Sequence, residues 1–256
     1  MTLIVNPEKL SKPERILWSF GVDDPADIDL EAIAFDLGAS IKQRPLTGCD
    51  ARLVRTDEAA IISINSDSHP LRQRFSLAHE LAHLIEDRGR KGFICAKEDI
   101  APQNSEAKSI EALANDFASQ LVLPSYLFLP RVAGKPVSFG TADKVSKEFK
   151  CSVSAAAIKL VRCSAEPALL VCHGQSKREW FMRNSVMSTD IWPQAEMHCE
   201  AEGFSLLYGA AAGMSRLTKE PANRWLSGPD IARRMATVQS LKVQDGTVLT
   251  IVTLGK

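Results

Sequence analysis

The segment that decides the fold runs from Leu71 to Asp87 and reads LRQRFSLAHELAHLIED. Apolar residues recur on nearly every side of this segment, which predicts a buried helix. Within it, His79, Glu80 and His83 form the pattern H-E-x-x-H. Residues four apart on a helix have Cβ atoms about 5–6 Å apart on one face, so both imidazoles can approach one Zn²⁺ at about 2.0–2.1 Å. Glu80 then lies beside the metal, in position to serve as the catalytic base.

A plainer interpretation is a buried helix whose two histidines are hydrogen-bonded inside the core. Two imidazoles and a carboxylate on a buried face are costly unless they are paired. A metal ion supplies that pairing directly. The energetic argument therefore favours a metal site at His79 and His83.

A catalytic zinc site combines three protein ligands with one open position. Glu111, on the next predicted helix at Ser109–Leu123, is the candidate third ligand, and Glu106 is its competitor. Asn115 shares the face of Glu111, so it could orient a ligand histidine through a hydrogen bond. From spacing alone, an exposed surface glutamate is an equally good interpretation of Glu111.

Two separate segments resemble the ImmA/IrrE-type metallopeptidases. The run from Arg74 to Leu84 is similar to the signature R-F-[ST]-x-A-H-E-x-x-H-x. The run from Glu111 to Ala118, followed by Leu123-Pro124, resembles E-x-x-A-N-x-F-A…L-P. The resemblance covers roughly residues 25–165. It implies that Glu111 is the third zinc ligand, and that the chain cleaves repressor-like transcription regulators in response to stress or DNA damage.

The remaining elements are expected from capping residues, periodicity and turn signals. Helices are expected from Asn6-Pro7 to Gly21, and over Asp29–Leu37, 142–149 and 153–162. Strands are expected over 52–55, 60–65, 168–172, 179–182, 238–243 and 247–254. The fold class is therefore α+β. A mostly helical zincin-like peptidase domain with a small β-sheet would occupy residues 1–165. A mixed α/β module with a sensor or partner-recruiting role would occupy 166–256.

The site and the resemblance define the expected cofactor and partner. Zn²⁺ is the expected metal, although two histidines and one carboxylate also suit Mn²⁺ or Fe²⁺. The expected partner is a protein substrate, a helix-turn-helix repressor. An alternative is a non-proteolytic regulator that uses the metal domain to hold a partner protein or DNA. A third interpretation places the enzyme in a toxin–antitoxin or mobile-element module.

Other parts of the sequence could bind DNA, hold a second metal ion or stabilise an oxyanion. The stretch 142–162 is helix-turn-helix-like, but a pair packed beneath the catalytic helices is favoured over DNA binding. His173, His198 and Cys199 lack the spacing of a second metal site. The tryptophans of the second half are expected to build its core. The candidate oxyanion donors, which the sequence cannot rank, are His69, Arg72, Arg74 and Tyr126.

Composition narrows the class of protein. The chain has 256 residues, with 31 Lys+Arg balanced by 31 Asp+Glu, so no polyanionic partner is required by net charge. Its six cysteines form no C-x-x-C pair, which argues against a disulfide framework. Neither a signal peptide nor a spanning segment is visible, so a cytoplasmic protein without a membrane partner is expected.

Overall fold

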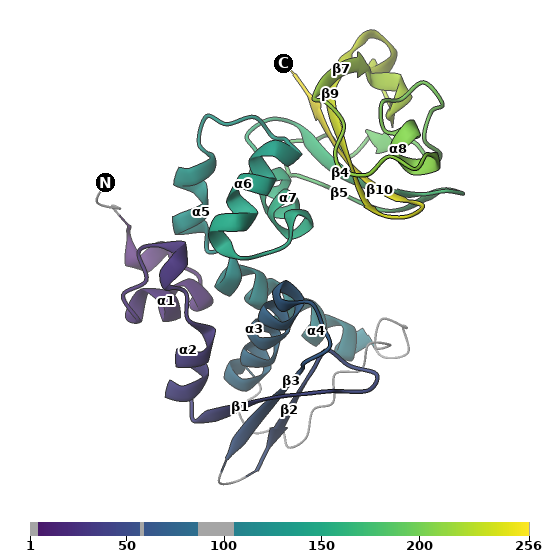
Figure 1. Ribbon diagram of the computed structural model, residues 1–256. Helices are drawn as coiled ribbons and strands as arrows, with labels where there is room; N and C mark the ends of the chain where they lie inside the picture. Colours follow the sequence, from purple (N-terminus) through teal and green to yellow (C-terminus); the bar gives the residue numbers. More distant parts are fainter. Residues whose placement is uncertain (1–4, 57–58, 87–104, 256) are drawn as a thin grey trace. The chain divides into compact units, whose positions relative to one another are not determined.

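The computed structural model describes residues 5–56, 59–86 and 105–255, with the backbone alone for 105–109 (Figure 1). The chain folds as two compact units. The first comprises Met1–Pro130 and Glu148–Ser152, and the second comprises Arg131–Lys147 and Val153–Lys256. The domain boundary that the sequence suggests near residue 165 stays a prediction.

The first unit contains the helices and the small sheet that the sequence places around the H-E-x-x-H pattern. Its helices are α1 (Lys12–Ser19), α2 (Leu30–Asp36), α3 (Pro70–Glu86), α4 (Ser105–Val122) and α5 (Ser125–Val132), with short 3-10 turns at Pro7–Lys9 and Pro25–Asp27. Its strands are β1 (Ala39–Arg44), β2 (Ala51–Arg55) and β3 (Ala60–Asn65). The sequence does not predict the α5 helix, because Pro124, directly before it, indicates the end of a helix.

The first helix begins later than its sequence suggests. Asn6 does accept a hydrogen bond from the Glu8 amide, but it caps only a 3-10 turn. The α-helix starts after Ser11, whose amide and hydroxyl both donate to Glu14 at 2.9 and 2.8 Å. This capping box satisfies amides that the helix itself leaves unpaired. The expected start of the α-helix at Asn6-Pro7 is therefore wrong, because the helix begins at Lys12.

The small sheet has three strands in the order β1-β3-β2. The sequence predicts β2 and β3, which pair antiparallel, but misses β1, which pairs parallel with β3. Most β1 side chains are exposed, so this strand lacks the apolar alternation that marks a strand in sequence. The buried face of the sheet, including Leu53 and Ile62, packs on the helices and fixes the position of α3.

The helices α3 and α4 pack side by side and form the framework of the site (Figure 1). Leu81 and Ala82 of α3 are fully buried. Ala114 and Ala118 of α4 are also buried. The small side chains of Ala82, Ala114 and Ala118 let the two helix backbones approach closely, so polar groups on the facing sides can meet.

The second unit is built on a five-stranded antiparallel sheet in the order β5-β4-β10-β9-β7. Its strands are β4 (Ala168–Gly174), β5 (Arg178–Arg183), β7 (Thr218–Pro221), β9 (Met235–Gln244) and β10 (Thr247–Leu254), and a separate short pair joins β6 (Trp192–Pro193) to β8 (Leu226–Ser227). Its helices are α6 (Phe139–Phe149), α7 (Val153–Arg162) and α8 (Phe204–Tyr208), with short 3-10 turns at Ala222–Arg224 and Ile231–Arg233. The predicted hairpin is present: Gly246, whose φ of 72° lies in the left-handed region, turns β9 into β10.

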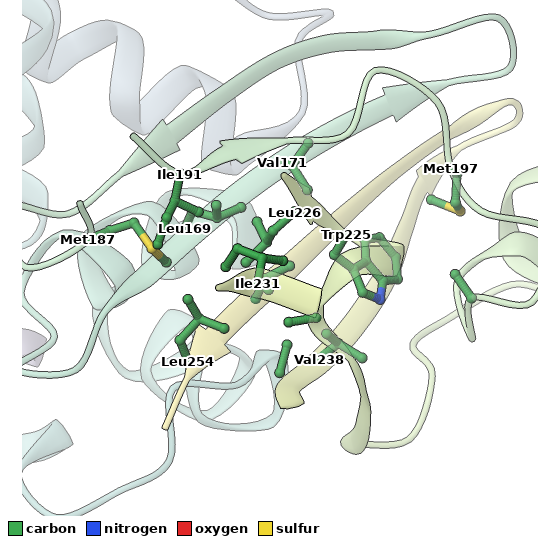
Figure 2. Packing of buried hydrophobic residues seen from close by; sticks show 14 of the residues in the cluster. Leu169, Val171, Met187, Ile191, Met197, Trp225, Leu226, Ile231, Val238 and Leu254 are labelled. Carbon is green, nitrogen blue, oxygen red and sulfur yellow. The ribbon is translucent and has the colours of Figure 1, made fainter. Parts of the chain in front are cut away.

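The core of this unit lies against one face of the sheet, where Figure 2 shows Trp225, Leu226 and Val238 among the clustered side chains. Trp225 is 1% exposed, as expected of a core residue. Trp180 and Trp192 are 41% and 50% exposed, so the expectation that they build the core is wrong. Trp180 lies on the edge strand β5, and Trp192, on the two-stranded β6-β8 pair, packs against Phe181 and Arg183.

The helix-turn-helix-like pair is present as α6 and α7. The expected packing of the pair beneath the helices of the H-E-x-x-H site stays a prediction. Within the second unit, α7 contacts β4, β5 and β10. Its apolar face, which includes Ala156 and Leu160, is buried, and so is Lys159. Lys147 of α6 is paired with Asp143 at 2.7 Å. Burial and pairing of these cations reduce the basic surface that reading DNA would need.

Candidate metal centre

The centre is formed by one face of α3 and one face of α4. His79 and His83 lie one turn apart on α3, and Glu111 projects from α4. His83 is 1% exposed, whereas His79 and Glu111 are 13% and 28% exposed at the side chain. The structure thus brings together the three residues predicted as ligands, with one side open to solvent. The side chain of the competitor Glu106 lies outside the described residues.

The three donor groups converge on one point. His79 Nε2 lies 3.1 Å from His83 Nε2 and 3.1 Å from Glu111 Oε2. His83 Nε2 lies 3.4 Å from Glu111 Oε1. Ligand atoms about 2.0–2.1 Å from a tetrahedral zinc ion lie about 3.3–3.4 Å from one another. One ligand atom from each of the three residues lies within 4.8 Å of the others, which is close enough for a single ion to bind all three.

The chemistry of these donors also fits a cation. His79 Nδ1 lies 3.1 Å from the amide oxygen of Asn115, which can only accept a hydrogen bond. The Nδ1 nitrogen therefore carries the proton, and in the neutral ring Nε2 presents a lone pair. That lone pair faces His83 Nε2 and the Glu111 carboxylate. Electron-rich atoms turned toward one another require a proton or a metal ion between them.

The two histidines set the charge of Glu111. When the two rings are protonated, hydrogen bonds from His79 and then His83 hold the pKa of the Glu111 carboxyl far below its ordinary value, against the opposing effect of burial. The carboxyl is consequently ionised at neutral pH and available as an oxygen ligand. Within the described residues, His79, His83 and Glu111 are the group of histidine, cysteine and acidic side chains placed to hold a metal ion. His173, His198 and Cys199 do not form a second such group there.

Glu80 follows His79 on α3, faces β2, and is 1% exposed. Burial raises the pKa of its carboxyl above the ordinary value, although the neighbouring His79 and His83 act in the other direction. The Leu53 backbone amide donates to this carboxylate. Its Oε2 atom is buried and has no hydrogen-bond partner. A buried carboxylate oxygen left open beside a metal centre has the properties of a general base.

Strand β2 is fixed along α3 at both ends. Before the strand, Asp50 accepts hydrogen bonds from Arg72 Nε at 2.9 Å and Ser68 Oγ at 2.8 Å. At its end, Arg55 Nη2 donates to the Leu84 carbonyl at 2.6 Å. The Leu53 amide meets Glu80 between these anchors. The edge of β2 therefore runs alongside α3 and past the candidate metal centre.

Each of the four candidate oxyanion donors has at least one hydrogen-bond partner. Arg72 pairs with Asp50, and Arg74 Nη2 donates to the Ile28 carbonyl at 3.0 Å. The Tyr126 hydroxyl donates to the Val22 carbonyl at 2.7 Å, and burial raises the pKa of Tyr126 well above its ordinary value. His69 Nδ1 accepts from the Leu71 amide at the start of α3. These contacts do not distinguish among the four, so the oxyanion donor stays a prediction.

Two packed helices carrying H-E-x-x-H and a converging glutamate, with a small sheet along the first helix, define a metallopeptidase-like domain. The Peptidase M78 family, described as the IrrE N-terminal-like domain, matches residues 34–161. The chain belongs to this family, as the two sequence segments around Glu80 and Glu111 predict.

The fold is similar to that of a Mycobacterium tuberculosis transcriptional regulator. The two share 14% sequence identity with a TM-score of 0.65, over 94% of this chain and 75% of that one. At this identity the similarity concerns the fold. None of the curated proteins matches the chain in sequence. Among the described residues, every helix is too short or too polar to cross a bilayer.

Proposed function

We propose that this chain is a zinc-dependent endopeptidase that cleaves a helix-turn-helix repressor in a stress or mobile-element response. The main support is the convergence of His79, His83 and Glu111, with donor separations of 3.1, 3.1 and 3.4 Å, beside a buried glutamate. The repressor substrate rests on the family resemblance. Zinc is proposed because three protein ligands with one open position form the usual catalytic zinc site, and the same donor set also suits Mn²⁺ or Fe²⁺.

The residues of the chain divide the chemistry between them. When bound by His79, His83 and Glu111, zinc lowers the pKa of a water molecule and polarises a carbonyl group. Glu80 Oε2, buried and unpartnered, accepts a proton from the attacking water. Because burial raises the pKa of Glu80, its carboxyl can also pass that proton to the leaving amine. Asn115 holds the His79 ring in the tautomer that presents Nε2 to the metal.

The edge of β2 offers a place for the substrate chain. In the part of the chain that the structure describes, β2 pairs only with β3, so its other long edge has no strand partner. An extended peptide can add to such an edge through backbone hydrogen bonds. Because Leu53 on β2 contacts Glu80, a peptide lying there passes the catalytic carboxylate. This arrangement favours an extended, locally unfolded segment of the repressor as the cleaved region.

The test combines metal analysis with cleavage of the repressor encoded next to the gene. We expect about one zinc per chain, retained in Glu80→Gln and lost in His83→Ala. Cleavage by Glu80→Gln should fall by about 10²–10⁴-fold or more, because the general base is gone. Glu86→Gln is the matched control: this exposed α3 carboxylate pairs with Lys12, so both zinc content and cleavage should persist.

Each outcome separates the alternatives. Full cleavage by Glu80→Gln would refute the assignment of the base. Stoichiometric zinc in His83→Ala would refute the ligand set. A wild-type protein that binds zinc and the repressor without cutting it would replace the peptidase with the non-proteolytic regulator.

A further inference from the structure

A second candidate site lies in the second unit, at the edge of its five-stranded sheet. Strands β7 and β9 pair antiparallel, with Lys219 directly opposite Thr237 and Pro221 opposite Met235. Side chains alternate between the faces of a strand, so Lys219, Thr237 and Met235 share one face. The alternate residues Glu220 and Ala236 are buried. The sheet thus turns a lysine and a hydroxyl outward at the same point.

Two arginines approach this point from the turn before β9. The turn Ile231–Arg233 follows Asp230, whose φ of 57° is in the left-handed region, and leads through Arg234 into the strand. The Arg234 carbonyl accepts from the Ala222 amide at 2.9 Å, and Arg234 Nη2 donates to the Gly255 carbonyl at 3.0 Å. Arg234 is therefore held by both its backbone and its side chain, and its remaining N–H groups are available.

These residues surround a cavity of about 370 Å³. The residues lining it are Lys219, Arg233, Arg234, Met235, Thr237 and Gly255. Three of the six are cations and none is acidic. Among the described residues, neither Lys219 nor Arg233 forms an ion pair. This concentration of charge is local, because the whole chain has 31 basic and 31 acidic residues.

Like charges around one concavity repel one another and focus a positive potential inside it. A multiply charged anion relieves that repulsion. Arginine presents a planar fork of donors that matches phosphate oxygens, and lysine and threonine can add further donors. The volume lies within the range of about 300–1,000 Å³ that is typical of small-molecule sites. Met235, 52% exposed, offers an apolar contact for the rest of a ligand.

We propose that this cavity binds a small molecule carrying phosphate groups, through Lys219, Arg233 and Arg234. The site belongs to the second unit and does not depend on the peptidase assignment. It would give this unit a ligand of its own, as a sensor module requires.

The test is calorimetric titration of the full chain with inorganic pyrophosphate, with ionic strength held constant. We expect saturable binding to the wild type, weakened about tenfold or more in Lys219→Met and in Arg233→Ala. Both positions are exposed, so these variants should fold, and thermal melting checks that they do. Arg216→Ala removes an exposed cation of the same unit that does not line the cavity, so its affinity should match the wild type.

Pyrophosphate can also bind metal ions, so the titration is repeated with His83→Ala. Unchanged affinity in that variant is expected. Binding lost in His83→Ala and retained in Lys219→Met would assign it to the metal centre and overturn the proposal. Absence of saturable binding to the wild type would do the same. A random-sequence DNA duplex that binds more tightly than pyrophosphate through the same cations would replace the small molecule with a nucleic-acid backbone.

Discussion

The bond between Asn115 and His79 offers a quantitative test of the metal centre. Asn115 Oδ1 lies 3.1 Å from His79 Nδ1, and Asn115 is exposed. A neutral hydrogen bond contributes about 0.5–1.5 kcal/mol net. An exposed bond of this length should contribute about 1 kcal/mol, equivalent to about fivefold in Kd. Groups that orient metal-binding histidines have effects of about 10–100-fold. For Asn115→Ala we therefore expect zinc affinity to fall about 5- to 20-fold.

Competition with a chromophoric zinc chelator measures this change directly. Asn115→Asp keeps an acceptor for His79 Nδ1 and adds charge, so its zinc affinity should equal or exceed that of the wild type. Gln120→Ala is the matched control, because it removes an amide from the same helix whose oxygen accepts from Ser125 Oγ. If Asn115→Ala changes the zinc Kd by no more than Gln120→Ala does, Asn115 does not orient His79, and the tautomer argument fails.

Two further predictions concern stability. Burial alone would raise the pKa of Glu14, but hydrogen bonds from Ser11, Ser125 and Tyr126 lower it below 4.5 overall. Urea unfolding should show Glu14→Gln less stable by about 1–3 kcal/mol at neutral pH, with the difference kept above pH 4.5 and lost as pH falls through the lowered folded pKa. A pH-independent difference would show that ionisation is irrelevant. Trp225→Phe removes the Nε1 donor that lies 3.0 Å from Glu220 Oε2, and chemical denaturation should show a loss of about 1–3 kcal/mol. An unchanged unfolding midpoint would contradict that contribution.

The sequence predicted the parts of the fold that carry strong periodic or capping signals. The α3 helix has both an apolar pattern and a recognisable motif, and it begins at Pro70, one residue before the predicted start; the predicted end at Asp87 lies outside the described residues. The α2 helix was likewise predicted from its cap at Asp29 and its stop at Gly38. By contrast, β1 exists because β3 offers it a parallel partner, and pairing of that kind leaves little trace in an exposed strand.

The sequence predicts some parts of the candidate site better than others. The spacing of His79 and His83 was sufficient to predict two groups on one face, because four residues make about one helical turn. The position of Glu111 depended on the crossing of α3 and α4, so the resemblance, not spacing, distinguished it from Glu106. The surroundings of Glu80 were beyond sequence reasoning, because the Leu53 amide comes from a strand 27 positions earlier in the chain.

That last contact links the sheet to the chemistry. A carboxylate buried as deeply as Glu80 is costly unless a donor offsets part of its lost hydration. If several donors satisfied it, its pKa would fall and its affinity for a proton would be lost. Glu80 lies between these two cases, because it accepts a hydrogen bond from one β2 amide and its Oε2 atom has no partner. The pKa of its carboxyl stays raised above the ordinary value. Because Asp50 and Arg55 anchor β2 at its ends, the strand that offers an edge to a peptide also holds the Leu53 amide that opposes the larger effect of burial on the pKa of Glu80.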